Sequence, residues 1–476
     1  MDIMKNIYVE DIIKLCNGIL VSGENNLVID NICTDTRKIQ KNDIFIAIKG
    51  EVYDGNKLYE EALKKGAIAV ILDNKEVITK EKYQDKTIIL VENTIKCLQQ
   101  LATYKRSLYD IPVIAVTGSV GKTSTKDIIY EVVKQKYNTL KTEANLNNHI
   151  GLPLTILKLK SHEALVIEMG MNHLGEIRTL TNIAKPTISI ITNIGTAHIG
   201  NLGSRENILK AKLEITEGMN NEGTLIINND NDLLNKEYNN LKEKYNTITI
   251  GINNKSDYNA INIEDNIFES NFKINNQPIT INVGGEAFIY NSLVAYAVGK
   301  ILKIEDSLIS KAIFNFKLSP HRLEKKETPN GITIIDDTYN ANMDSMLNAL
   351  SILSKLKNKR RVAILGDMLE LGEYTKEIHE KVGKEITPKT LDILITVGNN
   401  AKYIKEAALK NNFPDSNIYS FIDSNELIQS IDKILSTNDI VLLKGSHSMN
   451  LDKVVEHLVK FNRIKAWKIF NFTKIV

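Results

Sequence analysis

The stretch VIAVTGSVGKTS, from Val113 to Ser124, decides the fold of this chain. An apolar run passes into a short turn, from Gly118 to Gly121, and Lys122 follows at once. Glycines let the backbone turn tightly and direct N–H groups toward an anion, and the lysine adds a positive charge. The pattern therefore predicts a buried strand, a phosphate-binding loop and a helix in succession.

The run after this loop, DIIYEVVK from Asp127 to Lys134, has apolar residues at helical spacing. A bound phosphate would thus also lie at a helix N-terminus, where partial positive charge gathers. A hydroxyl of the same segment could hold Mg²⁺. The alternative is an ordinary strand–turn–helix corner with one exposed lysine. The residues expected to bind the nucleotide are Gly118, Ser119, Val120, Gly121, Lys122, Thr123 and Ser124.

Composition indicates a soluble globular protein. At 476 residues the chain should form two to four domains, and 43% hydrophobic with 25% charged residues is ordinary for such proteins. A formal net charge of +2 argues against a general nucleic-acid binder. Three scattered cysteines favour a reducing cytoplasm without structural zinc. We find no signal peptide and no apolar run long enough to span a bilayer, so we expect a cytoplasmic protein without membrane insertion.

Hydrophobic patterning divides the chain into three α/β blocks. Residues 1–105 contain short strands around one helix, and residues 106–317 alternate apolar strands with helices, as in a parallel sheet covered on both faces. Residues 318–476 repeat this alternation as a smaller, Rossmann-like doubly wound domain. An Asn-rich insert at 254–285 should form a hairpin. The expected strands of the two larger blocks are Val113–Thr117, Ala164–Met169, Ile188–Asn193, Thr224–Asn228, Thr333–Asp336, Arg361–Leu365, Ile393–Val397 and Ile440–Leu443.

Polar residues follow the ends of the central strands, where ligands of open parallel sheets bind. Glu168 ends an apolar run, where an unpaired carboxylate is costly unless it meets a cation. His198 follows the next strand, and Lys212 lies on the helix after it. With a threonine hydroxyl and phosphate oxygens these groups would suit Mg²⁺, although histidine is an atypical ligand for it. Taken singly, they could equally be a structural carboxylate, a surface histidine and a solvated lysine.

At this point the sequence resembles the Mur ligase family, the ATP-dependent ligases that build the peptide of bacterial cell-wall precursors. The loop TGSVGKT ending at Thr123 has that family's short glycine spacing, and Glu168, His198 and Lys212 stand at matching positions. The resemblance implies ATP and Mg²⁺ as cofactors. It assigns catalytic roles to Lys122, Glu168, His198 and Lys212. The metal ligands that it implies are Thr123, Glu168, His198 and Lys212. Lys212 matches a lysine that several relatives carry as a carbamate.

The resemblance extends over the whole chain. TDTR at 34–37, FIAIKG at 45–50 and DG at 54–55 are similar to the N-terminal domain that grips the UDP-sugar. Arg322 and Asp336 look like the residues that reach back to ATP from the last domain, and Asn291 like a residue near the adenine. The residues implied to bind the substrates are Asp35, Thr36, Arg37, Lys49, Asn145, Asn148, Asn340 and Asn342.

Three segments indicate a branch of the family: EANLNNHIGLP at 143–153, DDTYNAN at 336–342 and LGDMLELG at 365–372. They resemble the ligases that join D-alanyl-D-alanine to UDP-N-acetylmuramoyl-tripeptide through an acyl phosphate, and we expect a monomer. The sequence departs from the family pattern at two positions. Met343 replaces a usual proline, a residue that favours a helix start. His447 replaces a usual arginine. The alternatives are a sister ligase that adds the third amino acid, folylpolyglutamate synthetase, and a P-loop ATPase or switch.

Overall fold

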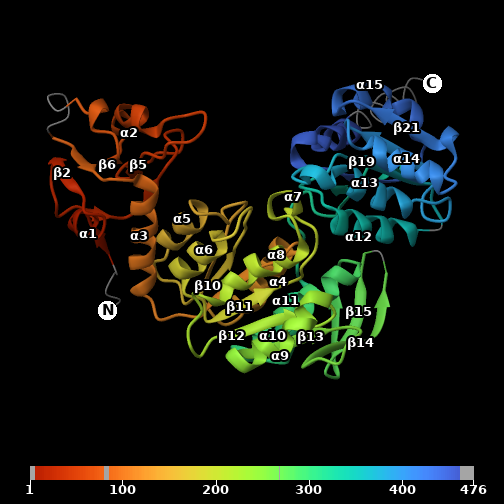
Figure 1. The fold of residues 1–476 in the computed structure, drawn as a ribbon, viewed down its shortest axis with the longest axis horizontal. Helices are drawn as coiled ribbons and strands as arrows, with labels where there is room; N and C mark the ends of the chain where they lie inside the picture. Colours follow the sequence, from red (N-terminus) through yellow and green to blue (C-terminus); the bar gives the residue numbers. More distant parts are fainter. Residues whose placement is uncertain (1–5, 80–84, 267, 357, 461–476) are drawn as a thin grey trace, which may run out of the picture.

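The structure, a computed structural model, describes residues 6–79, 85–266, 268–356 and 358–460. Three α/β bodies follow one another along the chain, built on sheets of five, nine and six strands (Figure 1). The predicted three-domain α/β architecture is confirmed. The exact boundaries stay predictions, and helix α3 (Thr94–Ser107) runs through the expected one at residue 105. None of the described helices is long and apolar enough to cross a membrane.

The N-terminal body is a five-stranded sheet in the order β2-β7-β6-β5-β4. Our prediction of a single helix in this block is wrong, because its described residues form three α-helices. Two of them, α1 and α2, have only seven and six residues, too few for a helical period to stand out in the sequence. The bounds are α1 Val9–Leu15, β2 Ile19–Ser22, β4 Ile32–Cys33, β5 Ile44–Ile46, α2 Tyr59–Lys64, β6 Ala69–Leu72 and β7 Thr87–Leu90, with the pair β1 Ile7–Tyr8 and β3 Val28–Ile29 beside them.

The central body has the sheet order β16-β15-β14-β13-β12-β11-β8-β10-β9. Strand β8 (Val113–Thr117) lies between β10 and β11, parallel to both, and all five of its residues are buried. That explains its unbroken apolar run. The remaining strands are β9 Thr139–Lys141, β10 Ala164–Glu168, β11 Ile188–Ile191, β12 Thr224–Asn228 and β13 Asn246–Gly251. The helices are α4 Lys122–Val133, α5 Gly151–Leu157, α6 Glu176–Ala184, α7 Ile199–Leu202, α8 Arg205–Leu213, α9 Asp232–Lys244, α10 Glu286–Ile301 and α11 Asp306–Phe314.

The Asn-rich insert forms the predicted hairpin and adds one more strand. β15 (Ser270–Ile274) pairs antiparallel with both β14 (Tyr258–Asp265) and β16 (Gln277–Ile281), and the three strands extend the central sheet. The insert also contacts the last body, because Asp265 is paired with Lys355, which directly follows α12.

The C-terminal body has the sheet order β17-β18-β22-β19-β20-β21, parallel except for β17 at one edge. Its predicted strands are present, and β17 and β21 are additional. The strands are β17 Glu324–Glu327, β18 Thr333–Asp337, β19 Arg361–Gly366, β20 Ile393–Val397, β21 Ile418–Phe421 and β22 Ile440–Lys444. The helices are α12 Met343–Ser354, α13 Thr375–Lys384, α14 Lys402–Lys410 and α15 Ser424–Ile434.

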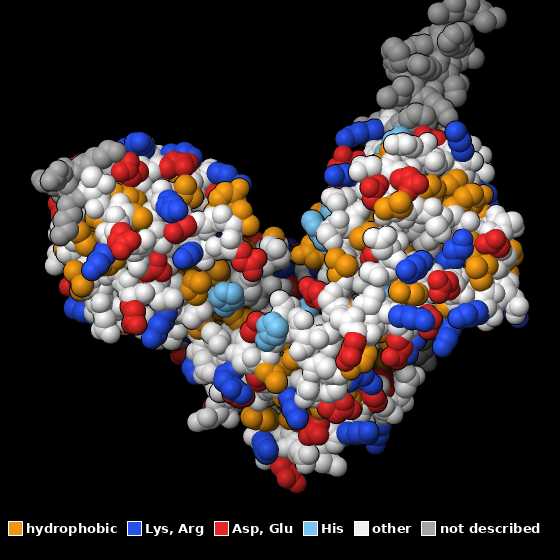
Figure 2. All heavy atoms as spheres, turned by 45° about the horizontal axis from the view of Figure 1, so that its top comes forward, with side chains coloured by type: hydrophobic (Ala, Val, Ile, Leu, Met, Phe, Trp, Pro, Cys, Tyr) orange, Lys and Arg blue, Asp and Glu red, His pale blue; other side chains and the backbone are white. Residues whose placement is uncertain are grey.

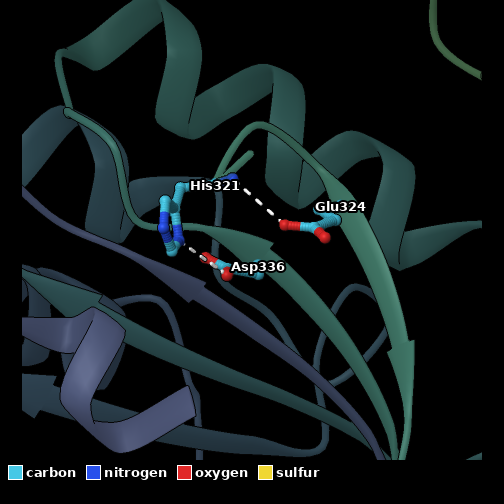
Figure 3. A group of neighbouring side chains, drawn as sticks. All are labelled: His321, Glu324 and Asp336. Carbon is cyan, nitrogen blue, oxygen red and sulfur yellow. Dashed lines mark hydrogen bonds and ion pairs between the residues drawn. The ribbon is translucent and has the colours of Figure 1, made fainter. Parts of the chain in front are cut away.

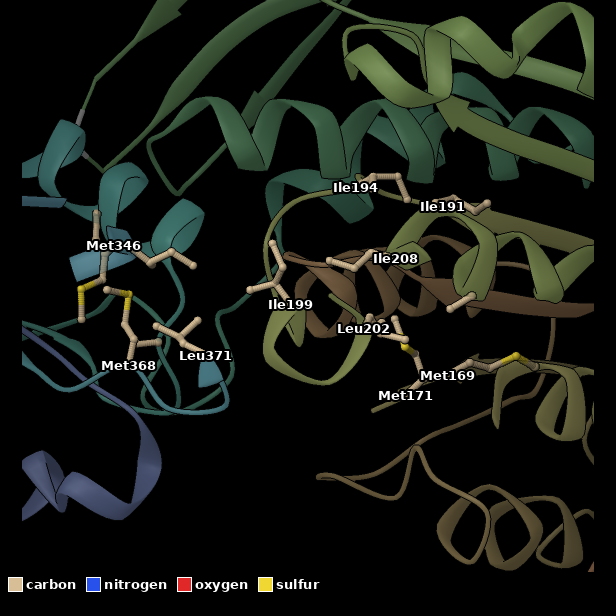
Figure 4. Close-up of a cluster of buried hydrophobic side chains, with 14 of the residues drawn as sticks. Met169, Met171, Ile191, Ile194, Ile199, Leu202, Ile208, Met346, Met368 and Leu371 are labelled. Carbon is tan, nitrogen blue, oxygen red and sulfur yellow. The ribbon is translucent and has the colours of Figure 1, made fainter. Parts of the chain in front are cut away.

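The central and C-terminal bodies touch through an apolar contact. Ile199 and Leu202 of α7 belong to the same buried cluster as Met346, Met368 and Leu371 of the last body (Figure 4). The space-filling view shows a broad hollow between the N-terminal and C-terminal bodies (Figure 2). The nucleotide loop therefore lies where a second domain can cover it.

Candidate active site

A cavity of about 570 Å³ opens between the P-loop, the ends of the central strands and the first part of the C-terminal body. This volume is typical of a cofactor-sized site. Many of the predicted site residues line it together. They are Ser119, Val120, Gly121, Lys122, Thr123, Ser124, Asn148, Glu168, His198, Asn291, Arg322, Asn340 and Asn342.

The P-loop is folded by its own glycines and by one asparagine. Gly121 has φ 82°, and a Cβ on Gly118 would lie 1.8 Å from the hydroxyl of Thr192, so neither position accepts a larger residue without strain. The backbone N–H groups of Ser119 and Val120 donate to Oδ1 of Asn193 at 3.1 and 2.9 Å. The predicted helix after the loop is present, and α4 begins at Lys122, five residues before the run that starts at Asp127.

Lys122 is held inside the loop that it serves. Its ammonium donates to the backbone carbonyl of Gly118 at 2.9 Å. Burial lowers the pKa of Lys122, and the nearby carboxylate of Glu168 partly opposes that shift. A phosphate in this cavity would therefore favour the charged form of Lys122, which burial disfavours.

Thr123, Glu168 and Arg322 form a linked group across two domains. The hydroxyl of Thr123 donates to Oε2 of Glu168 at 2.9 Å and accepts from Nη2 of Arg322 at 3.0 Å. Glu168 is 2% exposed, and its other oxygen accepts from the amide of Asn147 at 2.8 Å. Asn147 is a residue that the sequence did not single out. It lies in the same EANLNNHIGLP segment, where one asparagine could not be told from its neighbours.

Arg322 comes from the segment between the central and C-terminal bodies. Its guanidinium stacks on Tyr339, 4.1 Å from the ring centroid, and His447 meets the same ring edge-on. Next to it, Asp337 and Lys444 form an ion pair of 2.6 Å, and both line the cavity. Neither residue of this pair was predicted from the sequence.

Asp336 was expected to reach the nucleotide, and the structure places it elsewhere. Its side chain is fully buried, binds Lys326 and Thr338 within its own domain, and does not line the cavity. The adjacent Asp337 lines it instead. Successive residues of a strand point to opposite faces, so the sequence alone could not say which aspartate faces the cleft.

His198 lies in the cavity and faces the C-terminal body. Its Nδ1 lies 2.8 Å from Oε2 of Glu370, in an ion-pair contact whose angle is not that of a hydrogen bond. Both residues have positive φ, 64° and 63°. His198 lowers the pKa of the Glu370 carboxyl. The contact links a predicted metal ligand to the LGDMLELG segment of the other domain.

Lys212 is not the solvated lysine that its type would suggest. It is 1% exposed on α8 and is not among the residues that line the cavity. Burial, together with the positive charge of Lys122, holds the pKa of Lys212 well below its ordinary value. A buried amine beside another cation is a common route to a reactive, neutral lysine.

Helix α12 begins at Met343, where the resemblance to the family leads us to expect proline. Asn342 caps it by accepting from the backbone N–H of Ser345 at 2.9 Å, and the Ser345 hydroxyl accepts from the Asn342 N–H at 3.1 Å. This reciprocal cap keeps the helix start closed without proline.

The predicted UDP-binding residues lie in the N-terminal body, away from the cavity. Asp35 and Arg37 form an ion pair of 2.9 Å, which lowers the pKa of Asp35 to about 2. Thr36 is buried between them, and Lys49 forms a backbone bridge with Asp54. Asn145 is exposed and also lies outside the cavity lining.

A P-loop at the carboxyl end of a parallel sheet, covered by a second α/β domain that supplies an arginine, defines a nucleotide-binding enzyme of several domains. Family models agree with this class along the chain. The "Mur ligase family, catalytic domain" matches residues 28–106, the "Mur ligase middle domain" 116–299 and the "Mur ligase, glutamate ligase domain" 321–447.

The chain belongs to the Mur ligase family. It is 36% identical over 457 residues to the UDP-N-acetylmuramoyl-tripeptide--D-alanyl-D-alanine ligase of Bacillus subtilis (strain 168), covering 95% of this chain and 98% of the relative. MurF from Acinetobacter baumannii has a TM-score of 0.87 at 28% identity, covering 96% and 99%. MurF from Thermotoga maritima, solved in complex with ADP, has a TM-score of 0.79 at 28% identity, covering 91% and 98%.

Proposed function

We propose that this protein is an ATP-dependent ligase that joins D-alanyl-D-alanine to UDP-N-acetylmuramoyl-tripeptide. The observation that carries the proposal is the contact of Arg322 with Thr123 and, through it, with Glu168, which ties the P-loop to the second domain. Relatives of that name align over nearly the whole chain. A simple ATPase would give no reason for an acceptor-facing domain with its own polar cleft residues.

The reaction must activate a carboxylate before an amide can form. The tripeptide carboxylate attacks the γ-phosphorus of ATP, the bond from that phosphorus to the β–γ bridging oxygen breaks, and an acyl phosphate and ADP result. The amine of D-alanyl-D-alanine then attacks the acyl carbon, the C–O bond to phosphate breaks, and the amine loses a proton. Such chemistry needs alignment and charge neutralisation rather than a covalent protein group.

The residues of the cavity suit these tasks. Lys122 and Arg322 offset phosphate charge, and the loop N–H groups cradle the phosphates. A hydroxyl and a carboxylate 2.9 Å apart, from Thr123 and Glu168, fit a hard cation that prefers oxygen ligands. We therefore infer that these two residues hold Mg²⁺, which when bound neutralises charge on the transferred phosphoryl group. His198 is proposed as a further ligand.

Lys212 is proposed to act as a carbamate. Its burial and lowered pKa favour the neutral amine that reacts with CO₂. The N–C bond forms, one proton leaves, and the side chain becomes an anion. That anion would remove the repulsion between Lys212 and Lys122 and supply the negative charge that the phosphate-bound cation needs.

The remaining assignments complete the proposal. Asp35, Thr36, Arg37 and Lys49 hold the UDP end of the precursor, on the N-terminal side of the hollow. Asn145 and Asn148 bind the peptide of the precursor, and Asn340 and Asn342 bind the incoming dipeptide at the N-terminus of α12. Gly118 shapes the phosphate loop and Asn291 lies toward the nucleotide base. We propose a monomer that acts in the cytoplasm, where ATP and UDP-linked precursors occur together.

The test is a phosphate-release assay with components added one at a time. Release should need ATP, Mg²⁺, the UDP-linked tripeptide and D-alanyl-D-alanine together, and precursors ending in lysine or diaminopimelate can be compared directly. Equal release with a dipeptide precursor and a single amino acid would identify the sister ligase instead. Vigorous release with ATP alone would favour an ATPase and overturn the proposal.

A further inference from the structure

We propose that His321 is a positioning residue: anchored on buried Asp336, it aims the neighbouring Arg322 at the P-loop and its nucleotide. This inference rests on the proposed function and adds a role to two residues outside the cavity. Figure 3 shows the imidazole directed at Asp336, at the start of the C-terminal body. Asp336 thus acts through His321 rather than by touching ATP.

His321 is held at its side chain and at both backbone groups. Its Nδ1 lies 2.9 Å from Oδ2 of Asp336. Its backbone N–H donates to Oε2 of Glu324 at 3.2 Å, and its carbonyl accepts from the N–H of Tyr339 at 3.1 Å. Tyr339 is the ring on which Arg322 stacks. A backbone hydrogen bond therefore joins His321, which precedes Arg322, to Tyr339, on which Arg322 stacks.

The backbone around Arg322 is in an unusual conformation. His321 has φ 62° and Leu323 has φ 50°, in the left-handed region that residues with a Cβ rarely adopt. Such positions persist only where surrounding contacts determine them, and they concentrate at functional sites. The N–H of Leu323 donates to Asp337 at 3.3 Å. Both strained residues are thus tied to carboxylates at the end of β18, with the arginine between them.

Asp336 is a rigid support. Its carboxylate is fully buried, lies 2.5 Å from the ammonium of Lys326 and accepts from the hydroxyl of Thr338 at 2.7 Å. His321, Glu324 and Asp336 have the composition of a metal site. Lys326, however, lies within ion-pair distance of both carboxylates and already supplies the cation. The group therefore supports the imidazole rather than an ion.

The linker before His321 is fixed to the same helix that Arg322 reaches. Ser319 donates to Oδ2 of Asp127 at 2.7 Å, and Arg322 donates to Thr123. Thr123 and Asp127 are four residues apart, so they lie on one face of α4. The segment from Ser319 to Arg322 therefore runs along the helix that begins at the P-loop. A small rotation at His321 would move the guanidinium away from Thr123.

Three variants of the full-length enzyme separate positioning from simple stability. His321→Gly keeps the left-handed backbone and removes the imidazole, because glycine adopts that φ without strain. His321→Asn tolerates the same φ and retains a side-chain donor for Asp336. Lys303→Gly is the matched control, since Lys303 has φ 54° in a turn and is not among the residues that line the cavity. Each is also combined with Arg322→Ala.

We expect His321→Gly to lower kcat for phosphate release about tenfold with little change in melting temperature. His321→Asn should recover activity to within about threefold, and Lys303→Gly should match the wild type. In the Arg322→Ala background, His321→Gly should change kcat less than about twofold, because its effect passes through the arginine. The affinity for an ATP analogue, measured by calorimetry, gives a parallel cycle that needs no peptide substrate.

An equal loss in both backgrounds, or a fully active His321→Gly variant, would overturn the positioning role. So would a His321→Asn variant no better than the glycine one. If the wild type itself released no phosphate with D-alanyl-D-alanine, the proposed function would fail, while the calorimetric cycle would still decide whether His321 acts through Arg322. The two failures are thus distinguishable.

Discussion

Replacing Lys212 by methionine should make the protein more stable and almost inactive at the same time. The lysine is 1% exposed, it lies on α8 among the buried side chains of Ile208, Leu209 and Ala211, and no ion pair is recorded for its ammonium among the described residues. Methionine is similar in length and needs no partner. Removing a buried ammonium relieves its desolvation cost, on the order of 1–3 kcal/mol.

The sign of this effect follows from the pKa of Lys212, which is lower in the folded protein than its ordinary value of 10.5. Below pH 10.5 the unfolded chain therefore binds a proton that the folded chain tends to release, and this difference opposes folding. The cost shrinks as pH rises toward 10.5. The advantage of the Lys212→Met variant should accordingly be largest near neutral pH and narrow in alkaline buffer.

The assay is thermal unfolding in CO₂-depleted buffer between pH 7 and 10. Phosphate release is measured separately in bicarbonate-containing buffer, where the wild type can form the carbamate. For domains of this size about 1 kcal/mol corresponds to roughly 2–4 °C, so the variant should melt several degrees higher. Its activity should fall at least about a hundredfold, the usual scale for a lost electrostatic group in such a site. Lys210→Met, two residues away and exposed, is the matched control and should change neither quantity.

Bicarbonate supplies a further arm of the same experiment. When Mg²⁺ and nucleotide are present, bicarbonate should raise the melting temperature of the wild type. The melting temperature of the Lys212→Met variant should stay unchanged. In a Lys212→Ala variant, small carboxylic acids should restore part of the activity by filling the place of the carbamate. A Lys212→Met protein that melts lower than the wild type, or that works normally, would refute the reasoning.

Two other predictions test the nucleotide and precursor sites. Lys122→Ala should reduce turnover at least about a hundredfold while the melting temperature stays near that of the wild type, because the lysine has no role in the core; unfolding of the variant, or normal turnover, would contradict the phosphate-cradle assignment. Arg37→Ala should return the pKa of Asp35 from about 2 toward 3.8 in a carbon-detected NMR titration. The stabilising effect of this exposed pair is small, is present above pH 3.8 and disappears as pH falls through about 2; an unmoved pKa would show that Arg37 is not its cause.

Local pattern predicted the strand, loop and helix that border the cavity. The apolar run before Gly118 could only be a strand buried on both faces, and the glycines and Lys122 that follow it leave few alternatives. Glu168 was predicted beside this loop because parallel strands end at the same edge of a sheet. Its bond to Thr123 agrees with that inference.

The burial of other site residues depends on which face of a strand or helix is covered by its neighbours. The sequence alone does not give this information. Asp336 and Asp337 are consecutive on β18, and only the packing of the domain decides that the second lines the cavity while the first is buried with Lys326. Lys212 is similar, because a lysine on a helix looks solvated until the neighbouring elements are in place.

What the sequence by itself determined is the set of local choices: the phosphate loop, the order of three α/β blocks and the family they belong to. The tertiary structure alone decided the contacts between blocks, such as Arg322 on Thr123 and His198 beside Glu370. The partners of these pairs lie more than 170 residues apart. No spacing rule links such distant positions, because their approach depends on how whole domains pack and not on the period of any one helix or strand.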